Sequence, residues 1–302
     1  LAGLSASMPH VVNGRELITG NALAPTSGTI AVGVGGIIGV GIRAFVGGGD
    51  TGSQVVLVAA IVSFVVASFL ATRLAANALG PDHGAPVDTF ASVARGLVLG
   101  ARTLWEKVPA RNIMVTIIVN RFVFGVLTAG ALLLVRGSLH PPTDVDAALS
   151  DFVLATAGAA VGAFFGAVVT PTMTRRIGIG PWVGVVMVQG AVIGFALLTA
   201  TAITPQLVTL VAGAASIGLA GQSVKVCADT VLQRSIPDDR LGRVFALFDM
   251  IVNIALVTGI TATAFFSPIS GQFTGGYLIC GALLLLAAWW YRRSTRSPAQ
   301  PS

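Results

Sequence analysis

Three long apolar stretches of this sequence contain charged residues. Arg121 lies in one stretch, Lys225 and Asp229 lie four residues apart in another, and Asp249 lies in a third. An ionised side chain at the centre of a membrane helix costs about 2.5–3.5 kcal/mol on insertion scales, so such residues normally face the interior of a helix bundle or a water-filled cavity. In such a cavity the two cations can attract an anionic or polar group, and a carboxylate can exchange protons.

Helical geometry places the polar residues of the second stretch on one face. At 100° per residue, a set of five residues falls within about 80° of arc. These residues are Gly218, Gln222, Lys225, Asp229 and Gln233. The result is one polar stripe on an otherwise apolar helix.

Several polar residues also lie deep in their helices. With a rise of 1.5 Å per residue, Arg121 and Lys225 lie about 13–15 Å from the basic residues at the ends of their stretches, which is near the bilayer midplane. Asp249 and Asn253 lie about 9 and 15 Å into theirs. We therefore predict a substrate and coupling cavity formed by Arg121, Gln222, Lys225, Asp229, Asp249 and Asn253.

Each of these charges also has a purely structural interpretation. Lys225 and Asp229 can neutralise each other as an i,i+4 pair, while Arg121 snorkels or caps a helix. Asp249 can serve only to favour the N-terminus of its helix, where a negative charge is stabilised.

The composition is typical of an integral membrane protein. The 302 residues have a mean hydropathy of +0.87, and only 10% of them are charged, against about 25% in soluble domains. A helix needs about 20 apolar residues to cross a membrane. We predict an all-α polytopic membrane helix bundle with about eight transmembrane helices, at residues 24–42, 55–74, 113–135, 152–171, 182–202, 207–232, 244–266 and 277–291.

The first of these stretches is rich in glycine. Its glycines include Gly28, Gly35, Gly36, Gly39 and Gly41. Small residues permit close approach of helices in lipid, so we expect tight helix packing there.

Most of the 18 Lys and Arg residues lie in the segments on one side of the predicted membrane. Positively charged loops remain on the cytoplasmic side. We therefore predict a multi-pass protein of the bacterial cytoplasmic membrane with both termini of the chain in the cytoplasm. The net charge of +6 follows from this topology and does not indicate nucleic-acid binding.

The longest segment on the basic side divides the chain into three parts. We expect residues 1–72 to form the remnant of an N-terminal half with two transmembrane helices, and residues 111–302 to form a six-helix C-terminal half. Residues 73–110 form the linker between them. Apolar residues at helical spacing predict an amphipathic helix at the membrane surface in this linker, and a solvated linker helix is the alternative.

No pattern of metal ligands or catalytic residues is visible. Cys227 and Cys280 lie inside apolar stretches and are expected to be buried free thiols, while His10, His83 and His140 lie alone in predicted loops and are expected to be solvated. The sequence has no phosphate-binding loop and no Ser-His-Asp or Cys-His grouping. We expect no metal, no cofactor and no enzymatic activity.

A weak internal repeat relates the two ends of the chain. Leu17, Ala22, Leu23 and Gly35 align with Leu241, Ala246, Leu247 and Gly259, each set at the start of a span entered from the basic side. Internal repeats are typical of secondary transporters. In the second copy four spans precede the repeated segment, so we expect four further helices before the first copy.

The turn at residues 233–245, with its Ser-Ile-Pro-Asp-Asp-Arg-Leu-Gly-Arg core, resembles a loop of the major facilitator superfamily. The similarity is to the loop between spans ten and eleven in the bacterial branch of enterobactin-exporter-like and drug-antiporter-like proteins. Residues 9–23 resemble the branch's loop between spans four and five. The resemblance covers nearly the whole chain as spans five to twelve of twelve, which leaves the first four helices of the same protein to precede it.

The resemblance implies a secondary active transporter that works by alternating access. It implies a proton-coupled exporter of a small drug-like, siderophore-like or other polar or anionic molecule. A cytoplasmic gate is expected at Arg175, Arg176, Asp238, Arg240 and Arg243. These residues are equally well explained as ordinary positive-inside residues and their neighbours, and Arg175 stands where the family often has an acid.

Two other classes of membrane protein remain open at this stage. A non-transporting scaffold or sensor derived from a transporter is the main alternative. A channel requires a recurring ring of pore-lining groups, and no such pattern is visible.

Overall fold

The computed structural model describes residues 2–14, 16–47, 50–73, 90–141 and 143–295, and within this part of the chain every regular element is helical. The helices are α1 (Ala2–Val11), α2 (Leu17–Val46), α3 (Asp50–Ala71), α4 (Phe90–Glu106), α5 (Val108–Leu134), the π-helix η1 (Val135–Leu139), α6 (Val145–Ile177), α7 (Ile179–Gln189), the π-helix η2 (Gly190–Phe195), α8 (Ala196–Ile203), α9 (Leu207–Ser235), α10 (Asp238–Phe266) and α11 (Thr274–Thr295).

Within the described residues, seven helices are long and apolar enough to cross a membrane. They coincide with seven of the eight predicted stretches. The eighth, residues 24–42, lies within α2, whose 30 residues extend for about 45 Å. The predicted all-α membrane bundle is therefore confirmed.

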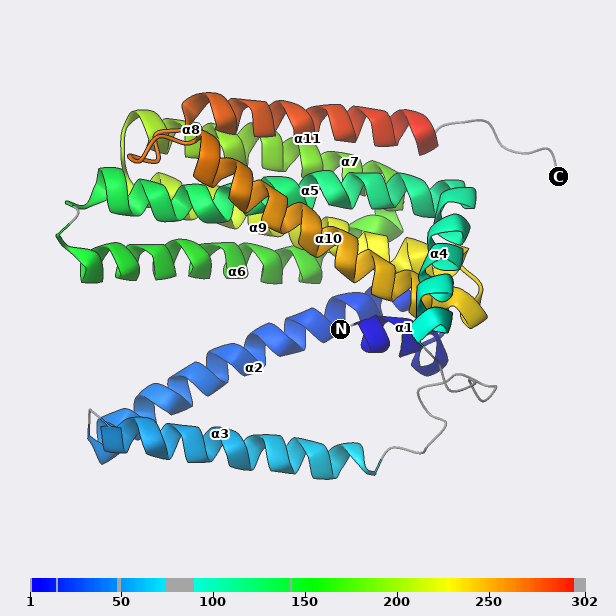
Figure 1. Ribbon diagram of the computed structural model, residues 1–302, viewed down its shortest axis with the longest axis horizontal. Coiled ribbons are helices and arrows are strands. Elements are labelled where there is room, and N and C mark those ends of the chain that lie inside the picture. The colour runs from blue at the N-terminus through cyan, green and yellow to red at the C-terminus, as the bar shows by residue number, and fades with distance from the viewer. Residues whose placement is uncertain (1, 15, 48–49, 74–89, 142, 296–302) are drawn as a thin grey trace.

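The helices from α5 to α11 lie side by side in one bundle, with α9 at its centre (Figure 1). α9 packs against α5, α6 and α7, and α10 packs along α5. The hairpin of α2 and α3 leaves this bundle at an angle, and α2 contacts α6 and α9 (Figure 1). Large apolar side chains of α3, such as Phe64 and Leu70, are exposed, as expected of a surface that faces lipid.

Local sequence sets the ends of two of the long helices. Asp144 caps α6, because its side chain accepts a hydrogen bond from the Ala147 N–H at 3.2 Å. Gly178 separates α6 from α7 with φ at +87°, a conformation that glycine adopts without steric cost.

Glycines bring the backbones of α6 and α9 together. Gly158, Gly162 and Gly166 recur every fourth residue on α6, and a Cβ on Gly162 would collide with the carbonyl oxygen of Ala215 on α9. From the other side, a Cβ on Gly218 would collide with the carbonyl oxygen of Ala159. This small-xxx-small pattern is typical of close helix contacts in membranes.

The close packing predicted at the glycines of α2 is not observed within the described chain. A Cβ added to Gly28, Gly35 or Gly41 would meet no atom within 4 Å. A Cβ on Gly39 would lie 3.8 Å from Val56 Cγ1 of α3, which is an ordinary van der Waals contact. Glycine content alone does not say which face of a helix meets a neighbour. The spacing of four residues seen in α6 is the more specific signal.

This contrast predicts opposite effects of two equivalent substitutions. Gly162→Ala should destabilise the protein by about 1–3 kcal/mol, because the added methyl group forces the α6 and α9 backbones apart. Gly35→Ala should be neutral or stabilise by up to about 1 kcal/mol, because alanine is the better helix former and nothing opposes it. Thermal unfolding of the two purified variants in detergent measures both effects, and equal melting temperatures would contradict the packing described above.

Candidate functional site

An ion pair lies in the interior of the bundle, on α9. The Lys225 ammonium donates to both oxygens of the Asp229 carboxylate, at 2.8 and 2.6 Å. Asp229 is buried, and Lys225 Nζ also lies 5.2 Å from the centre of the Phe248 ring on α10. Because the two charges are one helical turn apart, the pair is largely neutralised within α9 itself.

Arg121 on α5 has no such partner. Its Nε is buried without a hydrogen bond, and no carboxylate oxygen of the described residues lies within 4.0 Å of its guanidinium. Asp229 and Asp249 are the acidic groups whose charges reach it. The preceding residue, Asn120, is 1% exposed, and neither atom of its amide has a partner. A buried polar group without a partner costs about 1–3 kcal/mol, and more if it is charged.

A cavity of about 230 Å³ opens in front of Arg121, between α5, α6 and α9. Its polar side chains are Arg121, Gln222 and Thr156. Small residues form most of the remaining wall, namely Ala159, Ala160 and Ala163 of α6 and Gly218 and Gly221 of α9, together with Phe124. Arg121 and Gln222 are thus the two predicted site residues that the structure brings to one cavity.

The other predicted cavity residues lie elsewhere. Asn253 is exposed, and its amide donates to the Asp249 main-chain carbonyl at 2.7 Å. Asp249 is half-buried on α10, and neither residue lines the cavity. Asn253 therefore lies outside this cavity, because its depth in the helix follows from the sequence but the rotation of α10 does not.

The predicted gate residues fall into two groups at the end of the bundle where α9 ends and α10 begins, hereafter the basic end. Arg175 and Arg176 are exposed at the C-terminus of α6, and Asp238 begins α10. Arg240 donates to the Thr103 hydroxyl of α4 at 3.2 Å. The Arg243 side chain lies against Gly96 of α4, where a Cβ would come 3.1 Å from Arg243 Cδ. The last two arginines therefore attach α10 to α4.

A different set of side chains joins the two ends of the chain at the basic end. The Asn21 amide of α2 donates to Gln233 Oε1 at 2.6 Å and to the Thr230 hydroxyl at 3.1 Å, both on α9. Gln233 in turn donates to Asn21 Oδ1 at 3.1 Å and to the Ser5 main-chain carbonyl of α1 at 2.8 Å. We call Asn21, Thr230 and Gln233 the amide clasp. The sequence places Gln233 on the polar stripe of its helix but does not identify its partners. The one available signal was Asn21, a polar residue beside an apolar stretch.

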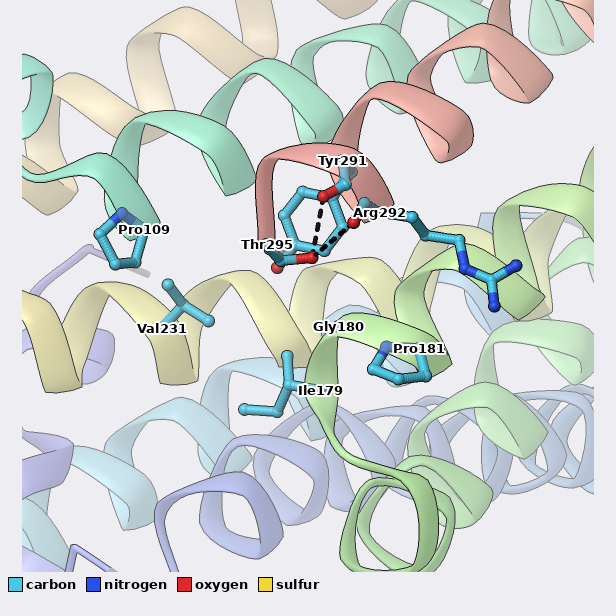
Figure 2. Close-up of a pocket in the computed structure, with 8 residues that line it drawn as sticks. All are labelled: Pro109, Ile179, Gly180, Pro181, Val231, Tyr291, Arg292 and Thr295. Atoms are coloured by element: carbon cyan, nitrogen blue, oxygen red, sulfur yellow. Dashed lines mark hydrogen bonds between the residues drawn. The ribbon is translucent and has the colours of Figure 1, made fainter. Parts of the chain in front are cut away.

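A second cavity, of about 350 Å³, lies at the basic end between α5, α7, α9 and α11 (Figure 2). In Figure 2 the Arg292 side chain points away from Tyr291 and Thr295, and a Cβ on Gly184 of α7 would come 2.7 Å from Arg292 Cδ. The Thr295 hydroxyl donates back to the Tyr291 main-chain carbonyl at 2.9 Å. None of the described side chains around this cavity is a buried polar group without a partner, so it has no feature that calls for a ligand.

One histidine differs from its prediction. His140 forms a hydrogen bond with Asp151 of α6, with 2.7 Å between Nε2 and Oδ2, so it is not simply solvated. The sequence separation of 11 residues hid this contact, which depends on how the chain turns after η1. His83 lies outside the described residues, as does the side chain of His10. Among the described residues no group of three metal-ligating side chains occurs.

Comparisons with known proteins connect this geometry to transporters. No protein-family model matches the chain. Two uncharacterized MFS-type transporters, from Mycobacterium bovis and Mycobacterium tuberculosis, are each 29% identical to it over 292 residues, which is 95% of this chain and 64% of the relative. The chain thus spans less than two thirds of the length of these relatives.

A solved structure has a similar fold. It is the crystal structure of a bacterial homologue of the iron transporter ferroportin in the outward-facing state, with a TM-score of 0.61 and 17% sequence identity over 96% of this chain and 66% of that one. The resemblance read from residues 233–245 and 9–23 is therefore confirmed, and the chain is a multi-pass membrane protein that is similar in sequence to MFS-type transporters and has the major facilitator fold.

Proposed function

We propose that the protein is a secondary active transporter that moves a small molecule by alternating access, with Arg121 as the main substrate contact. The observation that carries this proposal is the Arg121 side chain, which lines a cavity and whose buried Nε has no hydrogen-bond partner among the described residues. Midplane cavities between helices are where secondary transporters bind their substrates. Lys225 has a smaller part than the sequence predicts, since its charge is already paired with Asp229.

The direction and the coupling of transport are part of the same proposal. We place the basic end in the cytoplasm, because Arg234, Arg240 and Arg243 lie there. Residues 1–72 and 111–302 then belong to two halves that move against each other, joined by the linker at 73–110. Export coupled to protons rests on the resemblance to the drug-antiporter-like branch and on the two carboxylates whose charges reach Arg121.

The amide clasp has a defined place in this cycle. It joins α2 to α9 at the basic end, through hydrogen bonds between neutral groups. Alternating access requires that such contacts form when this end is closed and separate when it opens. The clasp therefore represents the state in which the cavity is closed toward the cytoplasm.

Removal of the Arg121 charge should abolish transport. Full-length protein in vesicles is tested for flux of lipophilic cations, weak acids and siderophore-like anions, with and without a pH gradient. Arg121→Gln should lose at least 90% of any gradient-dependent flux, since a charged hydrogen bond is worth about 1.5–3 kcal/mol. Arg136→Gln, which removes an exposed arginine of η1, is the matched control and should retain flux. Flux of every substrate at the wild-type rate in Arg121→Gln would refute the proposed contact, and no flux of any compound by folded wild-type protein would favour a scaffold or sensor.

The two carboxylates should differ in their effects. Asp249→Asn should keep the protein folded and remove the dependence of flux on the pH gradient, because Asp249 is half-buried and lacks a lysine partner. Asp229→Asn should destabilise the protein by about 3–5 kcal/mol, because it leaves Lys225 unpaired. Thermal unfolding and counterflow measurements on both variants test this. A folded Asp229→Asn protein without proton coupling, beside normal coupling in Asp249→Asn, would reverse the assignment.

Cross-linking of the clasp should arrest the cycle. In an Asn21→Cys/Gln233→Cys protein with Cys227 and Cys280 replaced by serine, oxidation or a short bifunctional maleimide should stop flux, and reduction of the disulfide should restore it. The two single-cysteine proteins, treated in the same way, should keep their flux. Undiminished flux after complete cross-linking would show that this end does not open during transport.

A further inference from the structure

A second, apolar space adjoins the cavity at Arg121. This space of about 320 Å³ lies between the same three helices and shares Phe124, Thr156 and Ala159 with the first. Beyond these shared residues it is lined by Leu127, Ala131 and Phe152, and by other apolar or small side chains. The two spaces are therefore neighbours with a common wall, one polar and one apolar.

The positions of the lining residues along α5 and α6 show on which side of Arg121 the apolar space lies. α5 runs away from the basic end, so Ala131 lies about 15 Å beyond Arg121 along the helix axis. Phe152 and Ala155 belong to the early turns of α6, which runs the opposite way along α5 (Figure 1). The apolar space therefore extends from the level of Arg121 toward the end of the bundle opposite the basic end.

The side chains that line the polar space favour binding of an anion over binding of a cation. Its one cationic side chain is Arg121, whose buried Nε lacks a partner, and the Asn120 amide beside it is also unsatisfied. The two ionised groups in the middle of α9, Lys225 and Asp229, form an ion pair with each other. The planar guanidinium suits carboxylate and phosphate oxygens, which it binds in a fork of two hydrogen bonds.

The size and lining of the apolar space suit a hydrocarbon group of limited size. Drug-sized ligands occupy pockets of about 300–1,000 Å³, and this space lies at the lower bound. Its one unshared polar side chain, Thr128, uses its hydroxyl to donate to the Phe124 carbonyl of its own helix at 2.9 Å. A single tail fits this description better than a pair of tails.

We infer that the substrate is an amphipathic anion, with a carboxylate or phosphate head at Arg121 and a single hydrocarbon tail between α5 and α6. This inference rests on the proposed transport function and names the substrate class. It follows from the neighbouring positions of Arg121, a half-buried cation without an ion-pair partner among the described residues, and an apolar space with no charged side chain in its lining.

Binding to the full-length protein in lipid nanodiscs tests this inference without any need for transport. Tritiated decanoate is the probe, with empty nanodiscs as the blank, and the competitors are hexanoate, octanoate, decyl phosphate, decanol and decyltrimethylammonium. Each added methylene from hexanoate to decanoate should strengthen binding about fourfold until the space is filled. Decanoate and decyl phosphate should both bind, and their relative strength identifies the preferred head group.

Three variants and one control separate the contribution of the head group from that of the tail. Arg121→Gln should reduce the preference for decanoate over decanol by roughly tenfold to a hundredfold and leave the dependence on chain length intact. Thr128→Phe should flatten the dependence on chain length and keep the preference for the anion. Phe152→Ala enlarges the apolar space and should move the optimum to longer tails, and Arg136→Gln should behave as wild type.

The outcomes distinguish this inference from the transport proposal. Binding of decyltrimethylammonium in preference to decanoate, or competition by hexanoate as strong as that by decanoate, would overturn the inference. Flux of a compound without a tail that survives in Arg121→Gln would overturn it and leave transport established. Binding with the stated dependence on Arg121 and on chain length, in a protein that moves no compound across the membrane, would uphold the site and refute the transport function.

Discussion

The cost of an ionised side chain inside an apolar bundle shapes the centre of this protein. Lys225 and Asp229 reduce that cost locally, since residues four apart on one helix meet before any tertiary contact forms. Arg121 lies on a different helix, and no described carboxylate lies within hydrogen-bond distance of it. Direct hydrogen bonds to its Nε are therefore left for water or a bound group, while the charges of Asp229 and Asp249 act on it from a distance.

Helix packing decides how much space this arginine faces. The α6 backbone comes close to α9 because Gly162 and Gly218 carry no side chain at the contact. The same stretch of α6 presents Ala159, Ala160 and Ala163 to the cavity, and side chains of this size do not fill the space in front of α5. Small residues thus have two effects in one helix, since they permit contact on one side and leave a cavity on the other. Larger residues on α6 would remove both.

The sequence predicts the helices well and the site only in part. Membrane thickness requires about 20 apolar residues per span, so hydropathy alone locates the spans from α3 to α11. Which face of a helix meets which neighbour depends on packing, and single-helix periodicity does not report it. This is why Arg121 and Gln222 share a cavity while Asn253 lies outside it, and why the glycine content of α2 is a weaker packing signal than the regular series in α6. The Asn21–Gln233 contact joins residues 212 positions apart, beyond the reach of any local pattern.

In the proposed transport cycle the amide clasp must open, and its chemistry suits such a contact. Exposed ion pairs contribute about 0–1 kcal/mol, so charge pairing at the surface of the basic end would add little to closure. Buried hydrogen bonds between neutral groups contribute about 1 kcal/mol each, and their separation leaves no unpaired charge behind. The total contribution of a few such bonds is therefore similar to the coupling free energy that a ligand typically supplies when it binds one state better than another, about 1–3 kcal/mol. Thr230 and Gln233 lie within two turns of Asp229 on the same rigid helix. A displacement of α9 at the cavity therefore acts directly on the clasp, without any intermediate element.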